Sequence, residues 1–267
     1  MRVGALQLIA LPDGSGREDP REVLFRPGAE SDPWEEHSDV LGVNGELELA
    51  VGGYLIRSGD RNILIDAGVG TIDNGKYRGG QFLESLRLNG LEPADITDVV
   101  LTHLHFDHVG WTTKKGAVVF ENATYFVHEQ DWAYFVDSPS AEAGAVRKLN
   151  PLRDQLELFS GDPTLAPGVD ARHTPGHTPG HTAIIVSSEG HRAALIGDLA
   201  HTPVELVEPD WHFVHDFDAT EAAAVRAAFV DEFTDTDTDI FAAHFPDLRA
   251  GRLQTRAGAP RWTYNKE

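Results

Sequence analysis

Residues 99–111 combine an apolar run with a dense group of side chains that can bind metal ions. The apolar run indicates a buried strand, and it stops at Thr102. The next six residues hold three histidines and one aspartate, namely His103, His105, Asp107 and His108. Imidazole nitrogens and carboxylate oxygens suit zinc, iron, manganese or cobalt. Four such groups exceed what one ion needs from a single loop, so we expect two ions.

The motif Thr-His-Leu-His-Phe-Asp-His at residues 102–108 resembles the signature of the metallo-β-lactamase superfamily of dinuclear hydrolases. The resemblance implies three further ligands, each at the end of a predicted strand: His177, Asp198 and His244. It assigns His103, His105 and His177 to one ion and Asp107, His108 and His244 to the other. Asp198 is then the bridge. The implied cofactors are two divalent ions, with zinc expected first and manganese, iron or cobalt as alternatives.

Two ions bridged by a hydroxide provide a nucleophile at neutral pH and a Lewis acid beside it. A histidine at position 105 favours hydrolysis over redox chemistry, because the related oxygen-reducing diiron proteins place a glutamate at the matching position. Asp107 is expected to be catalytic, since it can bind metal and also return a proton to a leaving alkoxide. Asp66 resembles a residue that orients a histidine ligand, with a turn-forming role as the equal alternative.

The substrate is less directly indicated. N-acyl homoserine lactonases share the ligand motif, but they place a tyrosine three residues after the bridging aspartate, where this chain has His201. The surrounding sequence is more similar to the branch that contains methyl parathion hydrolase and related quorum-quenching lactonases. We expect His201 to be catalytic, with packing as the alternative. Four aromatic residues are candidates for an apolar substrate pocket, with core packing equally open: Phe106, Trp111, Trp211 and Phe213.

Three functions follow from these residues. The first is a hydrolase that opens lactones of the N-acyl homoserine type or cleaves related apolar esters, with a phosphotriester or aryl ester hydrolase as the near alternative. The second is a thioesterase resembling glyoxalase II, which would need cations near the C-terminus, where four arginines lie: Arg249, Arg252, Arg256 and Arg261. The third is a metal-bound sensor without turnover, and the intact Asp107 argues against it.

The amino-acid composition limits the classes of substrate and partner that the protein is expected to bind. The chain has 22 basic and 43 acidic residues and a net charge of −21, which repels phosphate backbones and anionic membranes. We therefore expect a small-molecule substrate and neither nucleic acid nor membrane. The absence of cysteine excludes disulfides and thiolate ligands. Without a signal peptide or a long apolar run, a cytoplasmic protein is expected. The oligomeric state stays open, with a homodimer as one option.

The pattern of elements predicts an α/β (α+β) protein, an αββα sandwich of two mixed sheets flanked by helices, as one domain over residues 1–267. Residues 13–45 lack periodicity and are predicted to be a long loop or flap, in which Phe25 and Trp34 are either anchors or a cover for the active site. Strands are expected at residues 1–11, 47–56, 62–66, 96–101, 123–128, 182–187, 192–196, 252–256 and 261–264. Helices are expected at residues 79–90, 129–136, 138–159 and 218–233.

Overall fold

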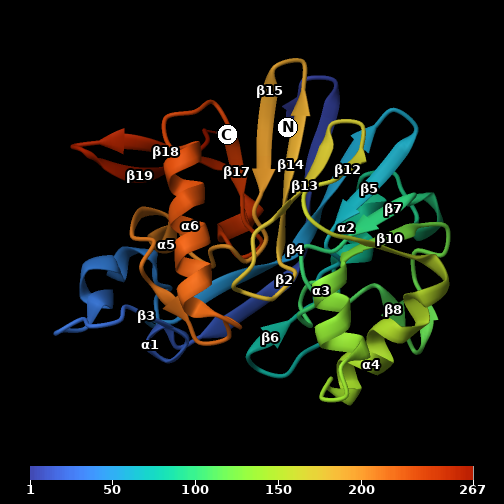
Figure 1. Ribbon diagram of the computed structural model, residues 1–267, viewed down its shortest axis with the longest axis horizontal. Helices are drawn as coiled ribbons and strands as arrows, with labels where there is room; N and C mark the ends of the chain where they lie inside the picture. Colours follow the sequence, from blue (N-terminus) through green and yellow to red (C-terminus); the bar gives the residue numbers. More distant parts are fainter. Residues whose placement is uncertain (267) are drawn as a thin grey trace.

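The computed structural model describes residues 1–266, and in them two β-sheets pack face to face with helices on both outer sides (Figure 1). Both sheets contain parallel and antiparallel neighbours. This arrangement is the predicted αββα sandwich. Residue 267, the last of the predicted single domain, lies outside the described residues, and the one-domain organisation is a proposal that the shared core supports.

The first sheet follows the order β1-β2-β4-β5-β7-β10-β11, with β6 paired to β2. Its strands are β1 (Arg2–Val3), β2 (Leu6–Glu18), β4 (Leu47–Ser58), β5 (Arg61–Ile65), β6 (Tyr77–Arg78), β7 (Asp98–Val100), β10 (Thr124–His128) and β11 (Leu156–Phe159). Helices α2 (Phe82–Leu88), α3 (Glu129–Trp132) and α4 (Ala143–Leu149) bury Phe82, Trp132 and Leu149 in one apolar cluster with strand residues such as Val99.

The second sheet follows the order β12-β13-β14-β15-β17-β18-β19. Its strands are β12 (Thr164–Ala166), β13 (Val169–His173), β14 (Thr182–Ser188), β15 (His191–Leu195), β17 (Asp239–Phe241), β18 (Gly251–Arg256) and β19 (Ala259–Tyr264). Helix α6 (Ala219–Phe233) covers its outer face through Phe229 and Phe233. Asp218 caps this helix by accepting hydrogen bonds from the amides of Thr220 and Glu221.

The core between the sheets is formed by β-branched and leucine side chains that alternate along the strands. Ile56 and Ile63 of the first sheet pack in one cluster with Ile184 and Leu195 of the second. Full burial of each such side chain contributes about 1.5–3 kcal/mol. The two sheets are thereby fixed against each other, which holds loops from both of them in constant relative position.

Residues 13–45 are more ordered than predicted. Residues 13–18 continue β2 as a strand paired with β4 and β6, so the loop prediction is wrong there. Beyond it lie α1 (Pro20–Val23), β3 (Leu24–Phe25) and the 3₁₀ helix η1 (Pro33–Val40). Trp34 is buried, donates its indole N–H to the carbonyl of Leu24 at 3.0 Å and packs edge-on against Trp211. Trp34 is therefore an anchor, whereas the side chain of Phe25 is exposed.

The region 138–159 also differs from the prediction of a helix. Its α4 gives way to a 3₁₀ helix, η4 (Asn150–Gln155), and residues 156–159 form β11, which pairs in parallel with β10. Pro151 stops the helical hydrogen bonds, and pairing with β10 satisfies the backbone that follows.

The remaining short elements are η2 (Pro93–Asp95), β8 (Thr113–Lys114), β9 (Ala117–Val118), the π-helix η3 (Ala133–Asp137), α5 (Pro203–Val207), β16 (His212–Phe213) and η5 (Pro246–Leu248). Within residues 1–266, none of the helices has the length and apolar character needed to cross a membrane.

Candidate metal centre

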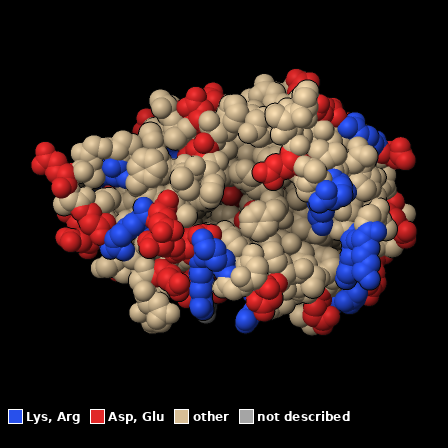
Figure 2. Space-filling model, turned by 90° about the horizontal axis from the view of Figure 1, so that it is seen from below, with Lys and Arg blue, Asp and Glu red and all other residues tan. Residues whose placement is uncertain are grey.

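The predicted ligands meet at one edge of the sandwich, on loops that leave neighbouring strands. The loop after β7 carries His103, His105, Asp107 and His108; the β13–β14 loop carries His177; the turns after β15 and β17 carry Asp198 and His244. Figure 2 looks onto this edge from below and shows a hollow near its centre with acidic groups inside it. All seven side chains have at least one ligand atom in a group compatible with metal binding.

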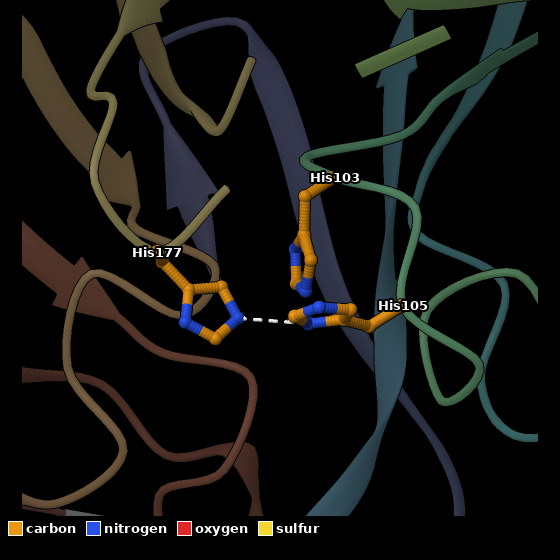
Figure 3. A group of neighbouring side chains, drawn as sticks. All are labelled: His103, His105 and His177. Carbon is orange, nitrogen blue, oxygen red and sulfur yellow. Dashed lines mark hydrogen bonds between the residues drawn. The ribbon is translucent and has the colours of Figure 1, made fainter. Parts of the chain in front are cut away.

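The first group joins the two sheets. His103 and His105 come from the first sheet, and His177 approaches from the second (Figure 3). His105 Nδ1 and His177 Nε2 are 2.9 Å apart. Nitrogen atoms on a shared tetrahedral zinc lie roughly 3.3 Å apart, from Zn–N bonds of about 2.0–2.1 Å. The two rings are thus close to the spacing that a single ion requires.

The second group contains Asp107, His108 and His244. Between the two groups lies Asp198, whose Oδ1 is 3.2 Å from His108 Nε2 and whose Oδ2 is 3.2 Å from His244 Nε2. Asp198 Oδ2 also lies 3.4 Å from His177 Nε2. One carboxylate therefore contacts rings of both groups, which is the position a bridging ligand occupies.

The outer nitrogens of the histidine rings are held by the protein. His108 Nδ1 lies 2.8 Å from Asp66 Oδ2, and the same carboxylate accepts hydrogen bonds from the amide and hydroxyl of Thr102. His177 Nδ1 lies 2.9 Å from Asp216 Oδ1, and His244 Nδ1 lies 2.8 Å from the carbonyl of Ala50. These partners fix each ring so that Nε2 faces inward. The orienting role expected of Asp66 is confirmed, and Asp216 is a support that the sequence did not reveal.

The inward atoms fit a pair of cations. His103 Nε2, His108 Nε2 and Asp198 Oδ1 are buried and have no hydrogen-bond partner among the described residues. Leaving such a group unpaired costs about 1–3 kcal/mol, more when it is charged. Divalent ions satisfy these lone pairs, and nitrogen and oxygen donors suit zinc and its neighbours. The donor set therefore fits a dinuclear metal site.

The pKa shifts of Asp198, His105 and His177 agree with this fit. Burial raises the pKa of Asp198, but the surrounding His244, His108 and His103 outweigh it and hold that pKa well below its usual value. Burial lowers the pKa of His105 and of His177 to about 3, so both rings are neutral at pH 7. Metals bind the ionised carboxylate and the neutral imidazole. Burial lowers the pKa of His108 and of His244, but Asp198 and other carboxylates outweigh it and raise both, so these two rings must release a proton when metal binds.

His201 adds a further ring to the centre. Its Nε2 is buried, has no hydrogen-bond partner within residues 1–266 and lies 3.5 Å from Asp198 Oδ2, and its ring stacks on Phe213 at 3.7 Å between centroids. Nδ1 lies 3.4 Å from Glu205 Oε1, and the buried Glu205 in turn pairs with Arg226 at 3.3 Å. Burial lowers the pKa of His201, but Glu205 and Asp198 outweigh it and raise that pKa to about 10.

The four aromatic candidates divide into two kinds. Phe106 is exposed and lines a cleft of about 800 Å³ that also reaches His105 and His177. Phe213 contacts the site through His201. Trp111 and Trp211 are buried in apolar clusters, and the indole N–H of Trp111 donates to Asp13 at 3.0 Å. For these two tryptophans the substrate-binding prediction is wrong, because packing and internal hydrogen bonds already use their surfaces.

A second cavity, of about 450 Å³, reaches the centre from the side of His201 and His244. Its wall includes His37 and Val40 of η1, together with residues of α5 and β19. Part of the 13–45 segment therefore borders a cavity next to the candidate centre. The larger cleft lies on the other side and is bordered by α4 and by the loop that follows β16.

Asp131 is a buried residue that the sequence did not point to. Its carboxylate accepts hydrogen bonds from the hydroxyl of Thr178 at 2.9 Å and from the amide of Gly180 at 2.6 Å. The backbone of Leu104, between two histidine ligands, also donates toward it. Asp131 thus ties the His177 loop of the second sheet to the ligand loop of the first. No local sequence motif predicts the contacts of Asp131, because their partners lie far apart in the chain.

Two backbone segments meet closely beneath the ligand loop. The amide of Gly110 donates to the carbonyl of Gly68 at 2.6 Å, and that of Trp111 donates to the carbonyl of Ala67 at 2.8 Å. A Cβ atom at Gly110 would lie 1.9 Å from the carbonyl carbon of Val69. The turn after β5 and the loop that carries the ligands therefore pack backbone against backbone.

The sequence and the fold were compared with those of known protein families and solved structures. Residues 51–244 match the family described as the metallo-beta-lactamase superfamily. The chain belongs to that superfamily. Among solved structures, AidC, described as a dizinc quorum-quenching lactonase in complex with a product N-hexnoyl-L-homoserine, has a TM-score of 0.88 and 26% identity. The match covers 100% of this chain and 97% of AidC.

Two further superfamily relatives extend the comparison. The hydrolase AbOPH has a TM-score of 0.83 and 24% identity over 100% of this chain and 97% of its own, which is a likeness of fold alone. An N-acyl homoserine lactonase of Bacillus sp is 28% identical over 176 residues, or 58% of this chain and 66% of the relative. The chain thus spans just under two thirds of the length of that curated relative.

Proposed function

We propose that this protein is a dinuclear metal-dependent hydrolase that opens lactones resembling N-acyl homoserine lactones, or cleaves related apolar esters. The observation that carries the proposal is Asp198 between two groups of inward-facing ligands. The likeness to AidC over the whole chain supports the same activity. The proposal assigns His103, His105 and His177 to one ion, Asp107, His108 and His244 to the other, and Asp198 to the bridge.

When bound, two divalent ions supply a hydroxide nucleophile and polarise the carbonyl oxygen. The chain contributes the remaining functions. Asp107 is almost buried, with Oδ2 3.6 Å from His244 Nε2. In this proposal its carboxylate carries a proton to the leaving alkoxide. His201 orders Asp198 or contacts a substrate oxygen. Phe106 contributes apolar surface for the acyl group in the cleft. Zinc is the metal we propose first, with manganese, iron and cobalt as alternatives.

A substrate panel tests this function. Metal-loaded protein is assayed on a lactone, an aryl ester, a phosphotriester and a thioester, with metal-stripped protein as the control. We expect the highest kcat/KM on the lactone and loss of that activity without metal. Metal analysis after dialysis should find close to two ions per chain. A preference for another substrate class, or binding of no more than one ion in excess metal, would contradict the proposal.

The arrangement of the arginines gives the thioesterase alternative less support than the lactonase proposal has. Arg252 pairs with Asp239 at 2.7 Å and with Asp237 at 3.1 Å, and Arg249 lies over the ring of Tyr264. Among the described residues, none of the four C-terminal arginines lines the larger cleft that reaches His105 and His177, and only Arg261 lines the smaller cavity beside His201 and His244. A phosphotriester or aryl ester hydrolase stays the second candidate, because His201 replaces the lactonase tyrosine. The substrate panel separates these two functions.

Location and assembly stay predictions. The proposal keeps a cytoplasmic location, a small-molecule substrate and no nucleic-acid partner. The net charge of −21 supports the last of these, because it repels phosphate backbones. The homodimer option is tested by light scattering on the metal-loaded protein.

A further inference from the structure

Lys148 is a cation on the wall of the larger cleft. It lies on α4, and its side chain is partly buried. Its Nζ donates hydrogen bonds to the carbonyl of Gly110 and, at 2.6 Å, to the carbonyl of Thr113. Gly110 and Lys148 both line the cleft that also reaches His105 and His177. The ammonium group is therefore close to the space that the candidate metal centre opens into.

The ammonium group of Lys148 can donate more hydrogen bonds than it makes to the described residues. A protonated lysine has three N–H donors, and within residues 1–266 only two acceptors are bonded to Nζ. No carboxylate forms an ion pair with it in that part of the chain, in contrast to Lys76, which pairs with Glu18 at 2.7 Å. Burial alone lowers the pKa of Lys148, with no charged group opposing it. One donor and one positive charge are thus left without a protein partner.

The rest of the cleft is largely apolar. Leu104, Val109 and Phe135 line it, and Phe106, Tyr134 and Phe217 expose aromatic surface at it. A wall of this kind holds hydrocarbon, while a few placed polar groups fix orientation. A cleft of about 800 Å³ has room for an acyl arm in addition to a lactone ring. A substrate that fills it brings part of the arm near Lys148.

We propose that Lys148 determines specificity by donating a hydrogen bond to an oxygen atom on the acyl arm of the substrate. The preferred class is then a lactone or ester whose acyl arm carries a keto, hydroxyl or carboxylate oxygen, rather than a plain hydrocarbon arm. This inference rests on the proposed hydrolase function and names the substrate class of the same site. A donor left unpaired by a plain arm costs affinity, whereas an oxygenated arm satisfies it.

A purely structural role makes a different prediction. The contacts to Gly110 and Thr113 join α4 to the segment that follows the ligand loop, and the hydroxyl of Thr113 donates to the carbonyl of Lys148 at 2.8 Å. If these contacts were the whole role, loss of the ammonium group would loosen that segment. All substrates would then be affected alike, and the melting temperature would fall.

The test compares wild type with Lys148→Met, which keeps an unbranched side chain, shorter by one atom, and removes all donors. Arg147→Met is the matched control, because Arg147 is an exposed cation on the same helix outside the cleft. Each protein is assayed on lactones with arms of equal length that are plain or carry a keto, hydroxyl or terminal carboxylate group at several positions. We expect Lys148→Met to lower the preference for an oxygenated arm by about tenfold, mainly through KM, and the control to leave it unchanged.

The oxygenated arms also distinguish the sources of the oxygen. A larger loss on the carboxylate arm identifies an anionic substrate, and a larger loss on keto or hydroxyl arms identifies a neutral one. Equal losses on plain and oxygenated arms, or no preference in wild type, would overturn the inference. Affinity for non-hydrolysable amides with the same arms is measured by calorimetry on the metal-loaded proteins. Failure of all turnover would therefore reject only the hydrolase proposal, while the amide affinities decide the role of Lys148.

Discussion

The two sheets contribute to the metal centre in different ways. The first sheet supplies four candidate ligands from one loop of six residues, whereas the second supplies His177, Asp198 and His244 from three separate turns. The compact loop is held by Asp66 and by backbone hydrogen bonds to the turn after β5. The three turns come together only because β14, β15 and β17 are neighbours in one sheet. Half of the site is thus local in sequence, and the other half depends on strand order.

The supports of the ligands differ in the same way. Asp66 serves the first sheet alone, since one carboxylate holds both Thr102 and His108. On the second sheet each ring has its own partner, such as Asp216 for His177 and Glu205 for His201. We infer that damage to a support on the first sheet displaces a whole loop, while damage on the second displaces one ring. The experiments below test this difference.

The largest effect is expected at Asp107, the one carboxylate that the compact loop contributes. Asp107→Asn should lower kcat by roughly 10²- to 10⁴-fold, because the amide cannot return a proton to the leaving group. Steady-state kinetics on the best lactone measure this loss. Metal content is determined on the same sample, since loss of a ligand oxygen would mimic it. Full activity with normal metal content would exclude the proton-transfer role.

Asp66→Asn and Asp216→Asn compare the two supports directly. Each should weaken metal binding by about 10- to 100-fold, because the orienting hydrogen bond of a histidine ligand is altered. Competition with a chelator measures the affinity for each ion. We expect Asp216→Asn to weaken one ion and Asp66→Asn to weaken binding more broadly and to lower the melting temperature. Equal behaviour of the two variants would remove the distinction between the sheets.

At His201 a smaller effect is expected. His201→Phe should reduce kcat/KM for lactones by about tenfold, equivalent to the roughly 1.4 kcal/mol of one hydrogen bond, with little change in melting temperature. His201→Tyr should recover part of this activity by restoring a donor. Glu205→Gln is a useful companion, since Glu205 contacts both the backbone and the ring of His201. Unchanged kinetics in the Phe and Tyr variants would assign His201 to packing.

Asp131 joins the two halves, and its effect should appear in stability rather than turnover. Burial raises its pKa from 3.8 to about 7, against the opposing hydrogen bonds of Gly180, Thr178 and Leu104. The folded protein then keeps a proton that the unfolded chain releases above pH 3.8. This stabilisation is complete at low pH and is lost as the pH rises to about 7.

Urea unfolding of wild type and Asp131→Asn across this range measures the contribution. The variant cannot titrate at this position, so wild type should lose more stability than the variant as the pH rises from 3.8 to about 7. Above that range the difference should be constant. A difference that does not change with pH would show that Asp131 has an ordinary pKa in the folded state.

The sequence was most informative where chemistry and local spacing coincide. His103, His105, Asp107 and His108 could be chosen from one loop, and the resemblance supplied His177, Asp198 and His244. Asp216 and Asp131 could not be found in this way, because their partners are distant in the chain and an isolated aspartate carries no signal. Trp111 was misassigned since sequence alone does not tell on which side of a loop a ring lies. Residues 13–18 were misassigned because glycine and proline hid a long strand.

Gly110 limits how the cleft can be redesigned. Any side chain there would meet the backbone of Val69 and Gly70 at about 2 Å, in segments that also hold the ligand loop in place. Saturation mutagenesis at this position should therefore return only glycine among metal-binding variants, whatever substrate is used for selection. Changes in substrate range must come from other residues that line the cleft, such as Lys148 and the exposed Phe106, Tyr134 and Phe217. A directed-evolution library can vary these aromatic residues while residues 66–70 and 110 are kept unchanged. Its variants should change substrate preference and keep the metal centre intact.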